Sequence, residues 1–197
     1  MWIPKFEPQT MTMKKWLFSL FISFLVIEGS AQTVVQRDPE IIGMVKEIST
    51  DSLKVYITKL VSFGTRSTLS STTDKKRGVG AAREWVVQRF NDFAKNSNGR
   101  MIAYVDSTTI PADGRRVDVA TNLGNAMAIL KGTDPNDDRI YVISGHLDSR
   151  VTDVMNRTAD APGANDDGSG VAAVMECARV MSKHSFPATI IFVAVST

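Results

Sequence analysis

The sequence is poor in the side chains that most often build disulfides and simple zinc sites. It has 197 residues but only one cysteine, Cys177, and two histidines, His146 and His184. A single cysteine cannot form an internal disulfide, and no Cys-rich zinc-finger spacing is possible. Because Cys177 lies in an apolar stretch with helical spacing, we interpret it as a small core residue and not as a catalytic thiol.

An excess of charge of one sign is also missing. Lys and Arg together number 23 against 21 Asp and Glu, so the net charge is +2. A chain this close to neutral gives no electrostatic reason to expect nucleic acid as a partner. Hydrophobic residues make up 43% and charged residues 22% of the chain, which is typical of a soluble globular protein. The length suits one domain with its own core.

No apolar run in the first part of the chain reaches the length of a membrane-spanning helix. Lys14 and Lys15 precede an apolar run over residues 16–27, and the small residues 29–31 follow it. A spanning helix needs about 20 apolar residues. A basic start, a short apolar run and small residues before a cleavage point are typical of a secretory signal peptide. The alternative is that the run is retained as a membrane anchor.

This pattern divides the chain at Ala31. Residues 1–31 are predicted to be a signal peptide with an upstream extension, since residues 1–10 fall outside the pattern. Residues 32–197 are then the N-terminal part of the mature domain. We expect a secreted or periplasmic protein that has no stable association with a membrane after the signal is removed.

Helical patterns precede strand patterns in the mature chain. Asp38 and Pro39 indicate a helix start, because an aspartate caps the first turn and proline suits its first position. Apolar residues at helical spacing predict further helices, and short apolar runs predict strands. The expected helices start near residues 39 and 51 and cover residues 80–94 and 170–181, and the expected strands cover 101–105, 125–130, 140–143 and 188–195. Apolar strands joined through a helix indicate an α/β fold whose sheet is buried on both faces.

The first polar loop of interest follows the predicted strand at 140–143. It contains His146 and Asp148, which point the same way in extended backbone. The aspartate can then hydrogen-bond one imidazole nitrogen and leave the other free for a metal. In α/β sheets, ligands bind at the carboxyl ends of strands, where this loop begins. A purely structural His–Asp pair is the alternative.

The second loop runs from Ala161 into the predicted helix at 170–181. It holds the adjacent carboxylates Asp166 and Asp167 between several glycines, which permit unusual backbone angles and close approach of the chain. The alternative is a helix cap without a metal, formed by Asp167 or Ser169.

Together the two loops resemble the family of leucine aminopeptidases and aminopeptidase Y, the di-zinc exopeptidases of metallopeptidase family 28. The resemblance rests on two motifs, GHLDS at 145–149 and PGANDDGSG at 162–170. It extends to FGTR at 63–66 and RGVGAAREW at 77–85. The resemblance implies a three-layer αβα fold with a mixed, mainly parallel central sheet.

The resemblance also implies the roles of individual residues. His146 is similar to a ligand of one zinc, and Asp166 to the aspartate that bridges both zinc ions. Asp148 is similar to the carboxylate that orients the histidine, and it is counted with the catalytic residues. The peptide bond between Asp166 and Asp167 is implied to be cis. The substrate would be a peptide, and the product its N-terminal amino acid.

The sequence departs from the family after the run at 188–195. In the family a Glu-Glu pair follows this strand, and a later Asp and His complete the metal shell, whereas this sequence ends at Thr197. His184, beside Lys183 at a predicted helix end, suits a surface role and does not replace them. We therefore expect the C-terminal half to be missing, and this chain to be an inactive fragment whose final apolar run is an unpaired, aggregation-prone strand. A glutaminyl-cyclase-like zinc enzyme and a non-catalytic binding protein on the same fold are the alternatives.

Overall fold

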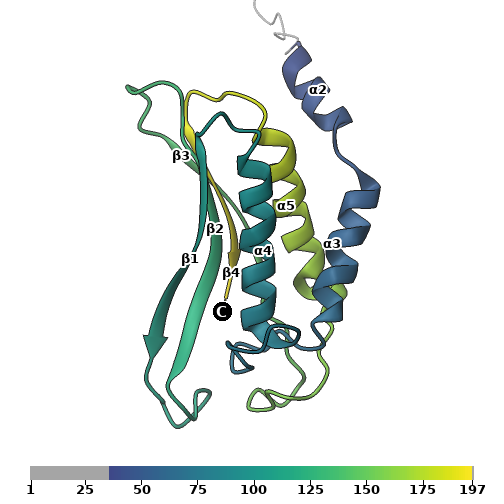
Figure 1. The fold of residues 1–197 in the computed structure, drawn as a ribbon, viewed down its shortest axis with the longest axis vertical. Coiled ribbons are helices and arrows are strands. Elements are labelled where there is room, and N and C mark those ends of the chain that lie inside the picture. The colour runs from purple at the N-terminus through teal and green to yellow at the C-terminus, as the bar shows by residue number, and fades with distance from the viewer. Residues whose placement is uncertain (1–35, 197) are drawn as a thin grey trace, which may run out of the picture. The chain divides into compact units, whose positions relative to one another are not determined.

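The computed structural model describes residues 36–196, so the predicted signal peptide lies outside the described residues. Its elements are α2 (Pro39–Lys46), α3 (Thr50–Ser62), α4 (Gly78–Ala94), β1 (Met101–Ile110), β2 (Thr121–Leu130), β3 (Ile140–His146), α5 (Ser169–Met181) and β4 (Thr189–Val195) (Figure 1). None of the helices in this range is long and apolar enough to cross a membrane.

Local sequence signals account for where the helices start and stop. The side chain of Ser49 accepts a hydrogen bond of 3.1 Å from the Ser52 amide and so caps α3. The chain leaves α3 through Gly64, whose φ of +72° favours glycine. As predicted, residues 65–77 form a loop before α4 begins. α5 starts at Ser169, and its N-cap Gly168 follows the PGANDD segment.

The strands form one mixed sheet in the order β1-β2-β4-β3. β2 pairs antiparallel with both β1 and β4, and β3 pairs parallel with β4. The predicted α/β class with a mixed sheet is therefore confirmed. One pairing of three is parallel, so the expectation of a mainly parallel sheet does not hold for the described strands.

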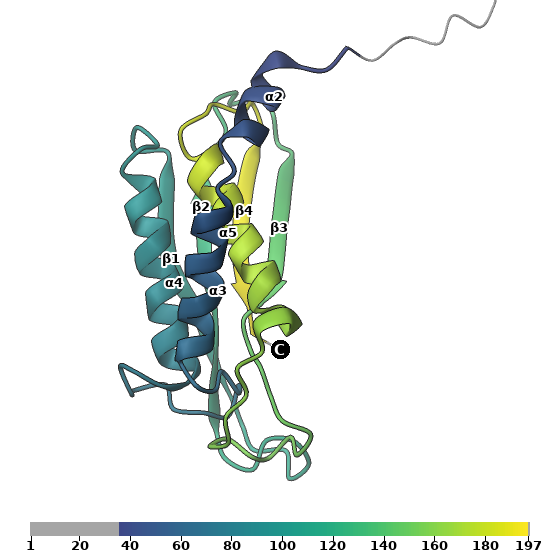
Figure 2. The ribbon, with the colours of Figure 1, turned by 90° about the vertical axis from the view of Figure 1, so that its right-hand side faces the viewer.

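The helices lie on one face of this sheet, as the two perpendicular views in Figures 1 and 2 show. α4 packs on β1 and β2, α5 packs on β3 and β4, and α3 packs against α5. Phe90 of α4, Met175 of α5 and Phe192 of β4 are completely buried between the layers. Cys177 is half-buried and packs against this core, as predicted, and its burial raises the pKa of its thiol.

The last strand has two neighbours. β4 lies between β2 and β3 and is hydrogen-bonded to both. The expectation of an unpaired strand at this end of the chain was therefore wrong. It failed because it assigned the neighbours of β4 to later sequence, whereas β2 and β3, which precede it, supply them.

The sheet face away from the helices carries a row of apolar side chains. Directly paired residues share a face, and the pairs Ile102–Ile129, Ile129–Ile191 and Ile191–Val142 cross all four strands. Ile102 and Val142, at the two ends of this row, are 59% and 60% exposed. Within residues 36–196, the expected three layers are thus represented by one helical layer and the sheet.

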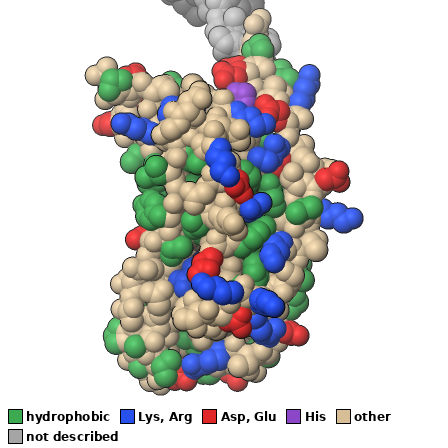
Figure 3. Space-filling view, in the orientation of Figure 1, with side chains coloured by type: hydrophobic (Ala, Val, Ile, Leu, Met, Phe, Trp, Pro, Cys, Tyr) green, Lys and Arg blue, Asp and Glu red, His purple; other side chains and the backbone are tan. Residues whose placement is uncertain are grey.

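The charged side chains are mixed over the surface. On the face drawn in Figure 3, Lys and Arg alternate with Asp and Glu and form no field of a single sign. Several surface ion pairs, such as Lys75–Glu84 at 2.7 Å and Arg77–Asp160 at 2.7 Å, join neighbouring segments. This distribution matches the near-neutral net charge of the sequence.

Candidate metal centre

The two loops predicted to carry chemistry meet where β3 ends and α5 begins. This meeting depends on Gly145, since a Cβ atom placed there would lie 2.7 Å from the carbonyl carbon of Gly170. The loop after β3 is also tied to the sheet, because the Leu147 amide donates a 2.7 Å hydrogen bond to the Val195 carbonyl. His146 is the last residue of β3 and therefore sits at the carboxyl end of that strand, as predicted.

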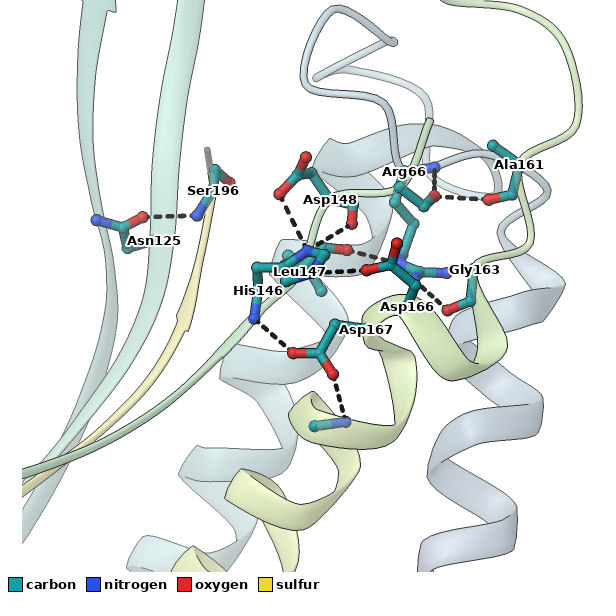
Figure 4. A network of polar contacts seen from close by, with 12 residues as sticks. Arg66, Asn125, His146, Leu147, Asp148, Ala161, Gly163, Asp166, Asp167 and Ser196 are labelled. Atoms are coloured by element: carbon teal, nitrogen blue, oxygen red, sulfur yellow. Dashed lines mark hydrogen bonds and ion pairs between the residues drawn. The ribbon is translucent and has the colours of Figure 1, made fainter. Parts of the chain in front are cut away.

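Both ring nitrogens of His146 face acceptors from these loops (Figure 4). Its Nδ1 lies 3.1 Å from the backbone carbonyl oxygen of Asp148, and its Nε2 lies 2.9 Å from Oδ1 of Asp166. The Asp148 carboxylate is farther from Nδ1, at 3.6 Å. Asp148 thus lies beside the nitrogen that it was predicted to orient, but its backbone carbonyl makes the close contact.

Asp166 is presented to solvent by an irregular turn over Ala164–Gly168. Its backbone angles, φ −111° and ψ 92°, are not helical, and the peptide bond to Asp167 is cis, as the resemblance implied. The Asp166 side chain is 91% exposed. With His146 and Asp148 it lines a cavity of about 520 Å³, whose other walls are Ser149, Arg150, Val151, Thr152 and Gly163.

Asp167 has a role that the sequence analysis saw only in part. Its Oδ1 accepts a 2.9 Å hydrogen bond from the Gly170 amide, so it caps α5, as the second-loop alternative proposed. Its Oδ2 also accepts a 3.0 Å hydrogen bond from the His146 amide. One carboxylate thereby connects the start of α5 to the end of β3. No local sequence signal announces this second contact, because the two residues are far apart in the chain.

The arrangement of His146 and Asp166 suits a shared metal ion. Two ligand atoms on one tetrahedral zinc, with bonds of about 2.0–2.2 Å, lie about 3.3–3.6 Å apart. The observed Nε2–Oδ1 separation of 2.9 Å is a hydrogen-bond distance, so the two atoms would have to move apart by a few tenths of an ångström to share an ion. Among residues 36–196 no group of three or more His, Cys, Asp or Glu side chains is placed to hold a metal. The described residues therefore offer His146 and Asp166 as two candidate ligands.

His184 lies elsewhere, as the sequence predicted. It follows α5, and its ring nitrogens are 3.1 Å from Glu47 and 3.4 Å from Glu40. Lys183 pairs with the same Glu47 at 2.7 Å. These contacts join the end of α5 to the region around α2. They account for the position of His184 without a metal ion.

Comparison with known sequences gives two findings. The model of peptidase family M28 matches residues 125–197, which include both loops. A probable zinc metalloprotease of Leptosphaeria maculans is 46% identical over 159 residues, which cover 81% of this chain and 36% of the relative. The chain spans about a third of the length of the curated relatives that it matches.

Solved structures share the fold. The aminopeptidase LapA of Legionella pneumophila has a TM-score of 0.57 at 21% identity, over 88% of this chain and 41% of that one. A zinc-dependent exopeptidase of Parabacteroides distasonis has a TM-score of 0.56 at 19% identity, over 76% of this chain and 47% of that one. A glutaminyl cyclase of Tannerella forsythia has a TM-score of 0.56 at 21% identity, over 76% of this chain and 47% of that one. The described residues therefore have a zinc-exopeptidase-like fold.

The sequence match, the relative at 46% identity and the shared fold agree with what the two loops indicated. GHLDS and PGANDDGSG both lie inside the matched range, and the structure brings them together at one site. The resemblance drawn from the sequence is confirmed: residues 125–197 match the model of peptidase family M28, and the chain is similar to probable zinc metalloproteases.

Proposed function

We propose that this protein is an exported zinc aminopeptidase that removes N-terminal amino acids from peptides at a site with two zinc ions. The observation that carries the proposal is the pair His146–Asp166, whose Nε2 and Oδ1 atoms face each other at 2.9 Å on the wall of a cavity. An imidazole and an adjacent, exposed carboxylate are common zinc ligands.

The residues of the site have separate tasks in this proposal. Asp148 occupies Nδ1 of His146 through its backbone carbonyl, which leaves Nε2 available for one zinc. Asp166 has two carboxylate oxygens in an exposed position, so it can serve both ions at once. Asp167 fixes the His146 backbone relative to α5. Zinc, when bound, supplies Lewis-acid polarisation of a peptide carbonyl.

The proposal concerns the whole protein. A catalytic zinc usually has three protein ligands, and the described residues offer two ligand candidates for the pair of ions. The matched region makes up 36% of the Leptosphaeria maculans relative, so that protein is about three times as long as the region described here. Remaining ligands and a general base are thus to be sought by experiment in the protein made from its complete coding sequence.

The test is a pair of site variants with a histidine control. His146→Ala and Asp166→Ala are each expected to abolish zinc-dependent hydrolysis of an aminoacyl anilide. His184→Ala, which changes the other histidine of the sequence, should leave hydrolysis unchanged. If His184→Ala is as damaging as His146→Ala, the assignment of the site is wrong.

Two further measurements separate the alternatives. Peptides with N-terminal glutamine are assayed for cyclisation, and cyclisation without hydrolysis would replace the aminopeptidase by a glutaminyl cyclase. Absence of both activities, with zinc bound, would favour a binding protein. Export is tested by sequencing the N-terminus of the secreted protein, which should begin at or near Gln32; an uncleaved protein in the membrane fraction would contradict it.

A further inference from the structure

Arg66 is the most deeply buried charged residue near the metal loops. Its exposed fraction is 0%. It follows Thr65, which forms a parallel bridge with Ala161 at the start of the second loop. Arginine is rarely buried so completely, because its charge must then be satisfied by nearby groups. The contacts of Arg66 therefore carry information about its role.

The guanidinium donates hydrogen bonds to four backbone carbonyl oxygens. Nε donates to Leu147 at 2.7 Å, between His146 and Asp148. Nη1 donates to Pro162 at 2.7 Å and Nη2 to Gly163 at 3.0 Å, so both hold the second loop upstream of Asp166. Nη1 also donates to Leu60 in α3 at 3.1 Å. One side chain thus joins both metal loops to the helical layer.

The backbone of Arg66 makes a second connection between the same loops. Its amide donates to Ser149 Oγ at 3.0 Å, and its carbonyl accepts from the Ser149 amide at 3.3 Å. The Ser149 hydroxyl then donates to the Ala161 carbonyl at 2.6 Å. The segment containing Arg66 therefore lies between the GHLDS and PGANDDGSG loops and bonds to each of them (Figure 4).

The second loop is shaped to fit this side chain. A Cβ atom at Gly163 would lie 3.0 Å from Nη2 of Arg66 and 2.6 Å from Cβ of Ser149. Gly163 also has a φ of +47°, which favours glycine. A residue larger than glycine at position 163 would therefore push the second loop away from the guanidinium of Arg66.

The charge of Arg66 fits its surroundings. Burial lowers the pKa of its guanidinium, and the nearby carboxylates of Asp148 and Asp167 act in the opposite direction. Arginine keeps its charge under such conditions and presents its donors in a rigid plane. A lysine has a single nitrogen and cannot reach four carbonyl groups in three segments at once.

We propose that Arg66 is a positioning residue for the metal site: by holding the Leu147, Pro162 and Gly163 carbonyls, it sets the separation of His146 and Asp166. This inference rests on the proposed zinc function. Arg66 does not itself line the cavity, but it donates hydrogen bonds to the wall residues Ser149 and Gly163, so it acts through the two loops.

The experiment compares two buried arginines in the protein made from its complete coding sequence. Arg66→Lys is the test variant. Arg83→Lys is the control, because Arg83 is also buried, at 5% exposure, but contacts Asn122 on β2 and not the metal loops. For each protein we would measure zinc affinity by competition with a chelator, urea unfolding without zinc, and amide hydrogen exchange without zinc.

Arg66→Lys is expected to weaken zinc binding by about 10–100-fold, the usual effect of losing a group that supports a ligand. It should also speed hydrogen exchange of the amides at 146–149 and 163–168. Arg83→Lys should leave both unchanged even where it lowers the urea midpoint. In Arg66→Ala, added guanidinium ion below denaturing concentration should restore part of the zinc affinity, and methylammonium should not.

Several results would overturn the proposal. Wild-type zinc affinity in Arg66→Lys would do so, and so would equal losses in Arg66→Lys and Arg83→Lys. If the Arg66 variants do not fold, Gly163→Ala places a Cβ atom against Nη2 of Arg66, and unchanged zinc affinity there contradicts the proposal. If wild type and His146→Ala bind zinc equally, the zinc function fails instead, and exchange rates in the zinc-free protein still decide whether Arg66 holds the loops.

Discussion

Replacing Asp167 measures how strongly the end of β3 is held to the start of α5. Its carboxylate accepts hydrogen bonds from the Gly170 amide at 2.9 Å and from the His146 amide at 3.0 Å. A hydrogen bond to a charged group contributes about 1.5–3 kcal/mol, and loss of a cap costs about 0.5–2 kcal/mol. Since Asp167 is half-buried, we take the lower part of each range and expect Asp167→Ala to reduce the free energy of unfolding by about 2–3 kcal/mol.

Urea denaturation followed by circular dichroism tests this value. Asp167→Asn keeps one acceptor oxygen, so about half of the loss is expected. Asp160→Ala is the control, because its ion pair with Arg77 is exposed and such pairs contribute about 0–1 kcal/mol. The reasoning is refuted if Asp167→Ala destabilises the protein no more than Asp160→Ala does.

Two further changes test other parts of the fold. Burial raises the pKa of Glu176, but hydrogen bonds from Arg179 and the Ser49 amide outweigh it, so the net pKa is lowered from 4.5. A group with a lowered pKa stabilises the fold above its unfolded pKa and loses this contribution as the pH falls. Glu176→Gln should therefore be clearly less stable than wild type at pH 7 and nearly equal to it in stability at pH 3. A stability difference that stays constant between these pH values would contradict this. Gly145→Ala should prevent β3 from approaching Gly170 and lower the melting temperature by several degrees, which thermal denaturation measures; an unchanged melting temperature would show that the contact can relax.

The sequence predicted the elements better than their ends and partners. The strand expected over 101–105 continues to Ile110. The extension was missed because Asp106–Thr109 are polar and exposed, and hydrogen bonds to β2, not burial, hold them in the strand. The pairing of β4 with β2 joins residues that are 60 to 68 positions apart, from Leu130–Ile190 to Ala126–Ala194, and no local pattern records it.

The candidate site divides in the same way. The position of His146 at the carboxyl end of a strand followed from the rule that ligands bind there in α/β sheets. That Asp166 belongs to the same site was implied by the family resemblance. Arg66 entered the sequence analysis only as part of a motif, since arginine is expected at the surface. Its burial depends on the nearby Leu60 carbonyl and on carbonyl groups of two loops that are distant in the chain. The contact of Asp148 through its backbone carbonyl was missed because side-chain alternation says nothing about the carbonyl groups.

The apolar row across the outer face of the sheet has a practical consequence for handling the protein. Fluorescent dyes such as anilinonaphthalene sulfonate bind exposed apolar surface, and their emission is commonly used as a sign of a molten globule. Ile102 and Val142 already offer such a surface in the ordered fold of residues 36–196. Dye emission from this region would therefore be a property of its native state, and loss of order has to be judged from near-ultraviolet circular dichroism instead.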